Sequence, residues 1–335
     1  MNTSTGNTTT PSPPTATIFP CTLHYPDIDD VTRYVFGSSF ILCALLAAIG
    51  NTISLVILNK PPMRTKSNRF LTSLAVSDSL VGFLLCPLTA ATLLDGRFLT
   101  RCDLESAKVF ISVMLCGTSA STVALVAYDR YVLLSSLQNY PVKMSDRKVR
   151  VLILSSWLVP VVLQVFYVVH GLLYLLSISV LTVGPFVIIS ISYRLMMKKI
   201  RQKEEELASH QHKGASRQNT KTDKKERKNL NLAHKLVSLI VYYVICLLPA
   251  LFNFLAEITI RVLKKQKPIS LQTLTVFALF CASVNSVINP AIYVSKYPEF
   301  KREFWKLFGF GRRFVRGRSS MSTVQPSTIS RTSLM

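Results

Sequence analysis

A long apolar stretch from about 105 to 137 constrains this chain most strongly. It contains no proline and ends in Tyr128-Asp129-Arg130-Tyr131. It exceeds the roughly 20 residues that cross a bilayer core as a helix, so we expect a span that is tilted or projects from the membrane. A largely polar stripe recurs on it at helical spacing: Lys108, Ser112, Cys116, Ser119, Val126 and Arg130. Such a stripe should face other helices or a wet cavity; hydroxyls bonded to their own backbone are the alternative.

Composition agrees that this is a membrane protein. Hydrophobic residues make up 49% of it and charged residues only 17%, against about 25% charged in ordinary soluble domains. Seven apolar segments occur, at about 34–59, 70–94, 106–137, 149–169, 172–198, 234–260 and 271–295. The sequence therefore predicts an all-α membrane protein, a seven-transmembrane helix bundle. We expect an outer tail over 1–33, the bundle domain over 34–308 and an inner tail over 309–335.

The distribution of charge predicts the orientation. The net charge is +22, yet the basic residues gather in alternate connections, after the first, third and fifth spans, and in the C-terminal tail. This positive-inside pattern predicts a plasma-membrane protein with its N-terminus outside and its C-terminus in the cytoplasm, and it argues against a nucleic-acid partner.

The first twenty residues contain no early apolar run, so we expect no cleavable signal peptide. Two glycosylation sequons begin at Asn2 and Asn7, and an outer tail would leave both accessible.

One carboxylate lies in the middle of an apolar span. Asp78 has no basic residue near it in its own segment. Because a lone buried carboxylate is costly, it needs a partner or a cation and is a functional candidate. Pro249 lies inside the sixth segment, where it should kink the helix and free backbone carbonyls.

The ordered motifs of the seven segments resemble those of the rhodopsin-like (class A) family of G-protein-coupled receptors. The resemblance covers about 34–308. Each segment carries at least one mark in family order: Asn51, Leu74 to Asp78, Asp129-Arg130-Tyr131, Trp157, Pro185, Pro249 and Asn289 to Tyr293. After the last segment, Phe300, Phe304 and Phe308 alternate with basic residues, which predicts a short amphipathic helix on the inner leaflet.

The resemblance implies a receptor that converts binding of an extracellular ligand into activation of a heterotrimeric G protein. Membrane lipids and, through the Ser/Thr-rich tail once phosphorylated, an arrestin-type adaptor are the other partners it implies. The residues implied in coupling and activation are Asp129, Arg130, Tyr131, Tyr193, Pro249, Asn289, Pro290 and Tyr293. Neither a metal-ligand cluster nor a phosphate-binding loop occurs, so we expect no enzyme. A seven-helix channel or transporter that uses Asp78 as an ion relay is the alternative.

Several positions depart from the family pattern. Leu247 replaces the usual sixth-span Trp, Tyr243 replaces a usual Phe, and the acidic partner expected near 227–229 is missing. The family's usual bridging Cys position on the third span is Glu105, so that bridge cannot form. The melanocortin and lipid-mediator branches resemble this chain in lacking it. Cys21 and Cys102 are the two cysteines predicted most clearly to lie outside, and we expect them to pair, with Cys86 as a further candidate.

The ligand pocket is expected where the family has it, beside Lys108, Ser112, Cys116, Phe83, Val113 and Phe254. A cation at Lys108 would suit an anionic, lipid-like ligand, unless this side chain snorkels to the headgroups. Ser283 replaces the retinal-linking Lys of opsins, and Ser112 replaces the Asp of amine receptors, so those two ligand classes are disfavoured.

An allosteric sodium ion is the one bound ion that the resemblance implies, and no other cofactor is expected. Its site would be formed by Asp78, Ser119, Asn285, Ser286 and Asn289. These side chains offer oxygen ligands without a positive charge, which suits a small hard cation. A protonated Asp78 hydrogen-bonded in the core is the alternative.

Overall fold

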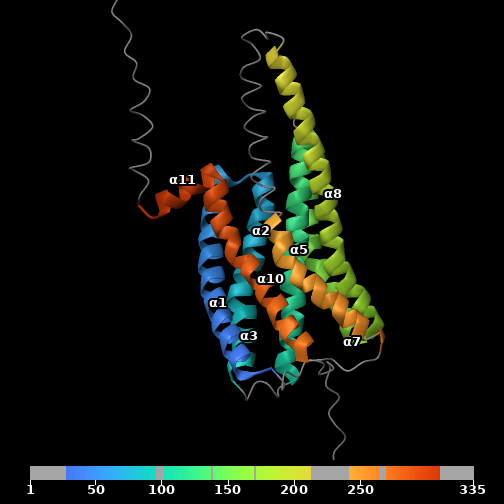
Figure 1. Cartoon of the computed structure of the whole chain (residues 1–335). Coiled ribbons are helices and arrows are strands. Elements are labelled where there is room, and N and C mark those ends of the chain that lie inside the picture. The colour runs from blue at the N-terminus through green and yellow to red at the C-terminus, as the bar shows by residue number, and fades with distance from the viewer. Residues whose placement is uncertain are drawn as a thin grey trace, which may run out of the picture.

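The computed structural model describes the backbone of residues 28–95, 102–136, 139–169, 171–212, 241–260, 262–263 and 269–309. It describes the side chains of all of these except 102–103, 165–178, 206–212 and 269–270. Every regular element in these ranges is helical (Figure 1). The elements are α1 (Asp30–Leu58), η1 (Pro61–Met63), α2 (Lys66–Leu80), η2 (Val81–Leu85), α3 (Cys86–Leu94), α5 (Cys102–Ser135), α6 (Tyr140–Lys143), α7 (Asp146–Val169), α8 (Gly171–His212), α10 (Ile269–Lys296) and α11 (Pro298–Leu307), with a further helix at Val241–Ile260.

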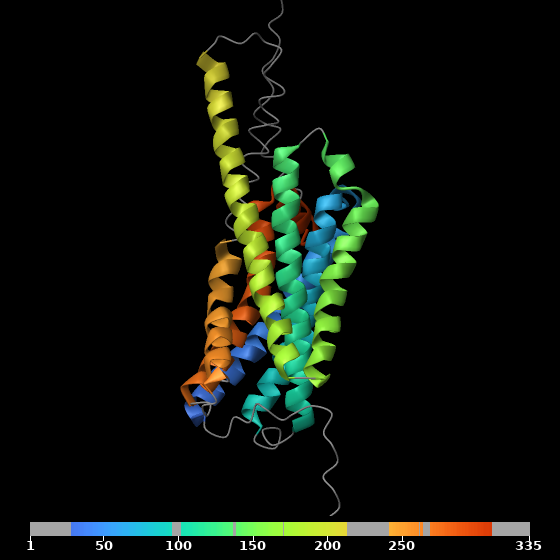
Figure 2. The same ribbon diagram turned by 90° about the vertical axis from the view of Figure 1, so that its right-hand side faces the viewer.

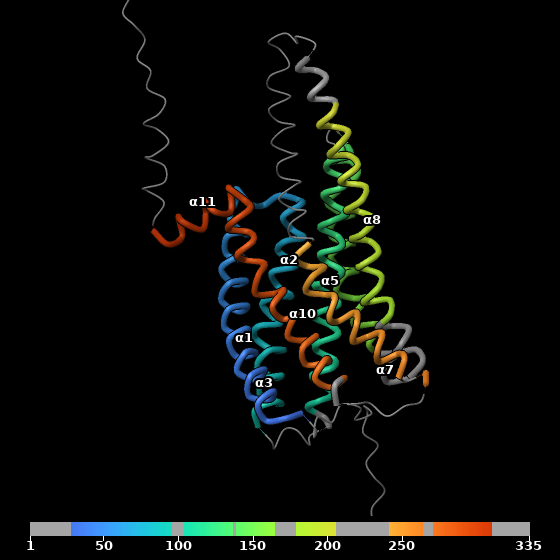
Figure 3. The backbone as a smooth tube through the Cα atoms, in the orientation of Figure 1, coloured from blue at the N-terminus to red at the C-terminus, as the bar shows by residue number. Residues whose placement is uncertain are grey.

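The long helices form one bundle around α5. This helix contacts α2, α7 and α8, while α1 contacts α2, α3 and α10 (Figure 2). Six of the described helical stretches are long and apolar enough to cross a membrane, and α7 lies beside them over the predicted fourth segment. The predicted seven-helix bundle is thus confirmed. α8 runs to His212, past the predicted end at 198, and projects beyond the neighbouring helices (Figure 3).

Polar side chains join the helices across the apolar interior. The Asn51 amide of α1 donates to the Ser286 carbonyl of α10 at 2.8 Å. The Trp157 indole of α7 donates to the Ser73 hydroxyl of α2 at 3.0 Å. In a membrane such bonds help to hold helices together, because apolar side chains gain little by leaving lipid for protein.

The second span has an irregular turn that the sequence analysis did not foresee. Val81–Leu85 forms a π-helical turn, and such a turn rotates the residues around it relative to a regular helix. Phe83 lies in this turn and is 57% exposed, so its place in a ligand pocket stays a prediction. Gly82 faces α1, where an added Cβ would lie 3.0 Å from the Ala44 carbonyl oxygen and closer still to the Ala48 nitrogen. A side chain at this position would push the two helices apart.

The amphipathic helix after the last span is confirmed as α11. It begins at Pro298, a residue suited to a first helical turn, and it turns away from the end of α10 (Figure 1). Its apolar face buries Phe300. Its Glu303 carboxylate is 2.7 Å from the Lys306 ammonium and 3.7 Å from that of Lys60 after α1. These contacts fix α11 against the first connection.

Several predictions concern residues outside the described ranges. They are the glycosylation sites Asn2 and Asn7, the tail 309–335 apart from its first residue, Cys21 of the predicted disulfide, and the side chain of Cys102.

Candidate functional site

The carboxylate of Asp78 lies at the meeting point of three helices. Its side chain is completely buried. Asp78 Oδ1 accepts hydrogen bonds from the hydroxyls of Ser119 on α5, at 3.2 Å, and Ser286 on α10, at 2.8 Å. Asp78 Oδ2 accepts one from the Asn289 amide at 2.6 Å. Three of the four residues predicted around this carboxylate therefore donate to it directly, and all three donors are neutral.

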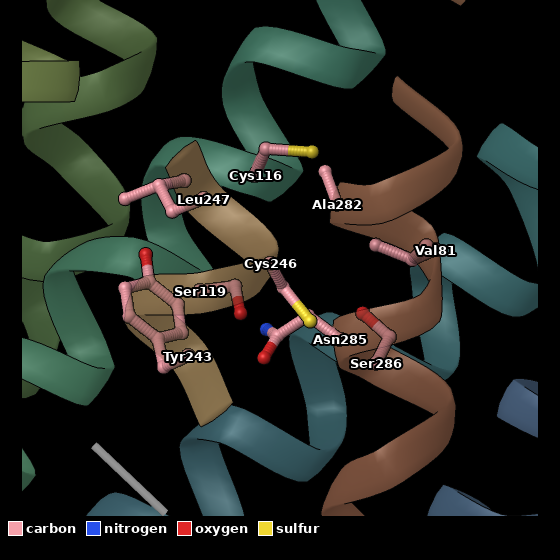
Figure 4. Close-up of a pocket in the computed structure, with 9 residues that line it drawn as sticks. All are labelled: Val81, Cys116, Ser119, Tyr243, Cys246, Leu247, Ala282, Asn285 and Ser286. Carbon is pink, nitrogen blue, oxygen red and sulfur yellow. The ribbon is translucent and has the colours of Figure 1, made fainter. Parts of the chain in front are cut away.

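A cavity of about 20 Å³ lies beside this cluster (Figure 4). It is lined by Val81, Cys116, Ser119, Tyr243, Cys246, Leu247, Ala282, Asn285 and Ser286. A space of roughly 10–15 Å³ on this measure holds one water molecule. Asn285, the remaining predicted residue, lines this cavity, and so do two departures from the family pattern, Tyr243 and Leu247. The space has the size of one small ion or water molecule.

These residues fit a small hard cation. The Asp78 carboxylate supplies negative charge, and the serine hydroxyls that donate to it keep lone pairs as further oxygen ligands. Hard cations prefer such oxygen sets.

A second buried carboxylate, that of Asp129, lies on α5 beside Arg130, the last residue of the polar stripe. Asp129 is 1% exposed. It accepts hydrogen bonds from the Ser67 hydroxyl of α2 and from the Tyr140 hydroxyl of α6, the latter at 2.7 Å. Arg130 is also buried, but its Nε stays 3.9 Å from Asp129 Oδ2. Within the described ranges this Nε has no hydrogen-bond partner.

The contact between Tyr140 and Asp129 was missed by sequence reasoning. Burial, followed by the charge of Asp129, raises the pKa of the Tyr140 phenol above its usual value. The phenol therefore stays protonated and continues to donate to the carboxylate. The sequence did offer one signal for this contact: Tyr140 precedes a proline in the short connection after Arg130.

Tyr293 lies near the same end of the bundle. Its ring is 1% exposed and contacts those of Tyr297 and Phe300, with centroids 6.0 Å and 5.6 Å away. In the described part of the chain, the Tyr293 hydroxyl lacks a hydrogen-bond partner, as Arg130 Nε does, while the Tyr297 hydroxyl lies close to the Arg130 side chain. The other predicted activation residues are half-buried: Tyr131, Tyr193, Pro249 and Pro290.

At the opposite end of α5, Lys108 is 3% exposed and does not snorkel to the surface. Its Nζ lies 2.6 Å from Glu105 Oε1 and 3.2 Å from the Thr92 hydroxyl. Glu105 stands at the family's usual cysteine position and was not predicted as a partner of Lys108, although a three-residue separation on a helix places the two side chains together. The positive charge of Lys108 is thus balanced inside the protein.

The remaining predicted pocket residues are dispersed. Ser112 donates to the Val109 carbonyl of its own helix at 2.9 Å, as the alternative for the polar stripe expected. Cys116 lines the small cavity beside Asp78. Val113 is half-buried and Phe254 is 8% exposed. Cys86 is fully buried and is a free cysteine, so it is wrong as a candidate for the outer disulfide.

Comparison with known proteins gives the same family over most of the chain. Residues 50–173 and 167–293 match the pattern of the 7 transmembrane receptor (rhodopsin family). The 5-hydroxytryptamine receptor 6 of Mus musculus is 31% identical over 124 residues, 37% of this chain and 28% of that receptor. The alpha-2B adrenergic receptor of Erinaceus europaeus is 30% identical over 121 residues, 36% of this chain and 31% of that receptor.

Two rhodopsins are similar over a longer range. The GQ-coupled rhodopsin of Mizuhopecten yessoensis is 21% identical over 320 residues, 84% of this chain and 61% of that protein. The chain thus spans less than two thirds of each of these three curated relatives. The crystal structure of squid rhodopsin superposes with a TM-score of 0.69 at 18% identity, covering 94% of this chain and 98% of that one. This likeness shows the fold, and the family match from residue 50 to residue 293 shows that the chain belongs to the rhodopsin family of seven-transmembrane receptors.

Proposed function

We propose that this chain is a cell-surface receptor that couples binding of an extracellular ligand to activation of a heterotrimeric G protein. The observation that carries the proposal is the state of Arg130, a buried cation whose Nε has no hydrogen-bond partner in the described part of the chain. A buried donor without a partner is costly, so it favours a rearrangement that supplies an acceptor. The names of the relatives, a 5-hydroxytryptamine receptor, an adrenergic receptor and a GQ-coupled rhodopsin, support the same function.

The proposed mechanism places the Arg130 end of the bundle in the cytoplasm. Pro249 lies inside the 241–260 helix and Pro290 lies inside α10, and proline lets a helix bend by removing a backbone hydrogen bond. Movement of the 241–260 helix away from α5 would open a cleft at Arg130. Its guanidinium, together with the Tyr293 and Tyr297 hydroxyls, would then bind the incoming G protein.

The proposal includes a sodium ion in the resting receptor, held by Asp78, Ser119, Asn285, Ser286 and Asn289. The ion would balance the buried charge of Asp78 and tie α2, α5 and α10 together. Its release would free α10 to move, which links the middle of the membrane to Arg130.

The extracellular ligand is proposed to bind near Lys108. Because Glu105 already neutralises this cation, an acidic ligand would have to displace the Glu105 carboxylate. The outer disulfide Cys21–Cys102, the glycans on Asn2 and Asn7, and the arrestin-type adaptor on the tail complete the proposal.

Reconstitution of the full chain in lipid nanodiscs with a heterotrimeric G protein tests this function. A ligand screen should find a compound that accelerates guanine-nucleotide exchange at least several-fold over nanodiscs without receptor. The same compound should evoke no current across planar bilayers that contain the chain. A current without nucleotide exchange would support the channel alternative, which family membership does not favour.

A further inference from the structure

A cavity of about 220 Å³ lies between α8 and the 241–260 helix. One face of α8 supplies most of its wall, and Leu251 supplies the opposite side. The α8 residues recur every three or four positions: Val183, Phe186, Val187, Ser190, Ile191 and Arg194. The two helices lie side by side in both views, the 241–260 helix in orange (Figures 1 and 2).

The wall of this cavity faces the lipid and not the interior of the bundle. Val183, Val187 and Ile191 are 41%, 48% and 53% exposed, although they belong to the apolar stretch Ser179–Glu205 that is long enough to cross a membrane. Apolar side chains left open on a membrane span are covered by acyl chains. The cavity is therefore a hollow in the lipid-facing surface, separate from the cluster around Asp78.

Arg194 is the one charged residue in this wall. Its side chain is exposed, and none of the acidic residues in the described ranges forms an ion pair with it. It lies four residues, or about 6 Å along the helix, before Lys198 on the side of the apolar span. A cation at that depth needs an anion or a polar headgroup within reach.

We propose that this cavity binds one anionic phospholipid. The Arg194 guanidinium donates to the lipid phosphate, for which its planar fork is well suited. The acyl chain lies along Val187 and Val183 against Leu251. A basic residue near the membrane surface also attracts the net negative charge of the headgroup. A sterol would fill the apolar wall but would leave Arg194 without an anion, so the charge favours the phospholipid.

The proposal concerns the membrane and is independent of coupling to a G protein. Leu251 lies two residues after Pro249, on the helix that is proposed to move. A bound lipid would therefore contact both walls of a hollow whose shape changes with that helix.

Native mass spectrometry of the purified full chain with palmitoyl-oleoyl phosphatidylserine, palmitoyl-oleoyl phosphatidylcholine or cholesterol tests the proposal. The wild-type chain should bind phosphatidylserine in preference to phosphatidylcholine. Arg194→Gln should weaken phosphatidylserine binding about tenfold, as expected for loss of charge-assisted hydrogen bonds. Arg150→Gln removes an exposed cation on α7 that does not line the cavity, and should change binding less than twofold.

A second pair of variants tests the apolar wall. Ile191→Trp fills the cavity and should reduce binding of phosphatidylserine several-fold. Ile188→Trp is the matched control, because Ile188 is 48% exposed on the same helix but does not line the cavity. Equal effects of the two arginine variants, equal effects of the two tryptophan variants, or binding of cholesterol that is tighter than that of phosphatidylserine would each overturn the proposal.

Discussion

Two buried ion pairs lie at opposite ends of α5, and they differ in how completely each cation is bound. Lys108 lies 2.6 Å from Glu105 and also reaches Thr92. Arg130 stays 3.9 Å from Asp129, whose carboxylate is occupied by hydroxyl donors. We call Glu105–Lys108 the closed pair, because its cation is bound within the protein. We call Asp129–Arg130 the open pair, because part of its cation has no partner.

The spacing of the residues explains this difference. Side chains three apart on a helix lie on one face and can meet, whereas adjacent side chains point in different directions. Glu105 and Lys108 therefore pair closely, while Asp129 cannot pair closely with its neighbour and turns to Ser67 and Tyr140. Because its acid is the adjacent residue, Arg130 is buried without a close partner and can bind another group.

The largest expected effect comes from breaking the closed pair. Lys108→Met should lower the free energy of unfolding by about 3–5 kcal/mol, because it leaves the Glu105 carboxylate buried without a cation. Thermal unfolding of the purified chain in one detergent measures this loss. The double variant Lys108→Met/Glu105→Gln should recover most of it, since the uncompensated charge is gone. A Lys108→Met variant as stable as the wild type would contradict the claim that Glu105 needs this cation.

A several-fold change in the basal rate of nucleotide exchange is expected from the Asp78 cluster, which lies between the two pairs. Sodium should lower the basal rate of nucleotide exchange several-fold relative to potassium at equal ionic strength, because the ion holds α2, α5 and α10 in the resting arrangement. Asp78→Asn should remove this difference, because the amide brings no charge to the cation. Exchange rates that are equal in the two salts for the wild type would exclude the sodium site.

A smaller effect is expected from Tyr140→Phe, which should make the Asp129–Arg130 pair as close as the Glu105–Lys108 pair. Tyr140→Phe removes one donor from Asp129, so the carboxylate should draw Arg130 closer. We expect receptor-catalysed nucleotide exchange to fall about two- to fivefold, a part of what a hydrogen bond to a charged group contributes. Tyr242→Phe is the control, because Tyr242 is 49% exposed. Exchange that is unchanged or faster in Tyr140→Phe would contradict this account of the pair.

The smallest effect concerns the pH dependence of α11. The hydrogen bond from Lys306, with the charges of Lys306, Lys60 and Arg302, lowers the pKa of Glu303 below its model-peptide value despite its burial. The carboxylate therefore stabilises docking of α11 above pH about 4.5, and this contribution is lost as the pH falls through the lowered pKa. A spin label at Leu307 should become more mobile on acidification in the wild type. Glu303→Gln should show higher mobility at neutral pH and a weaker pH response.

The sequence predicts the helices from local patterns, and it predicts the residues around Asp78 through the resemblance to the receptor family. Apolar length sets each span, and donors at family positions converge on Asp78 once the helices pack. The position of Phe83 could not be predicted, because the π-helical turn at Val81–Leu85 depends on packing of Gly82 against α1. The Tyr140–Asp129 bond depends on how a short connection folds back. The Glu105–Lys108 pair was accessible from spacing alone.

Receptor-catalysed guanine-nucleotide exchange by Arg130→Ala tests most directly the claim that the open pair serves coupling. The account predicts at least a tenfold loss of exchange with an unchanged amount of folded receptor, while Arg150→Ala, which removes an exposed cation of α7, stays near the wild type. Exchange by Arg130→Ala at the wild-type rate would contradict the account.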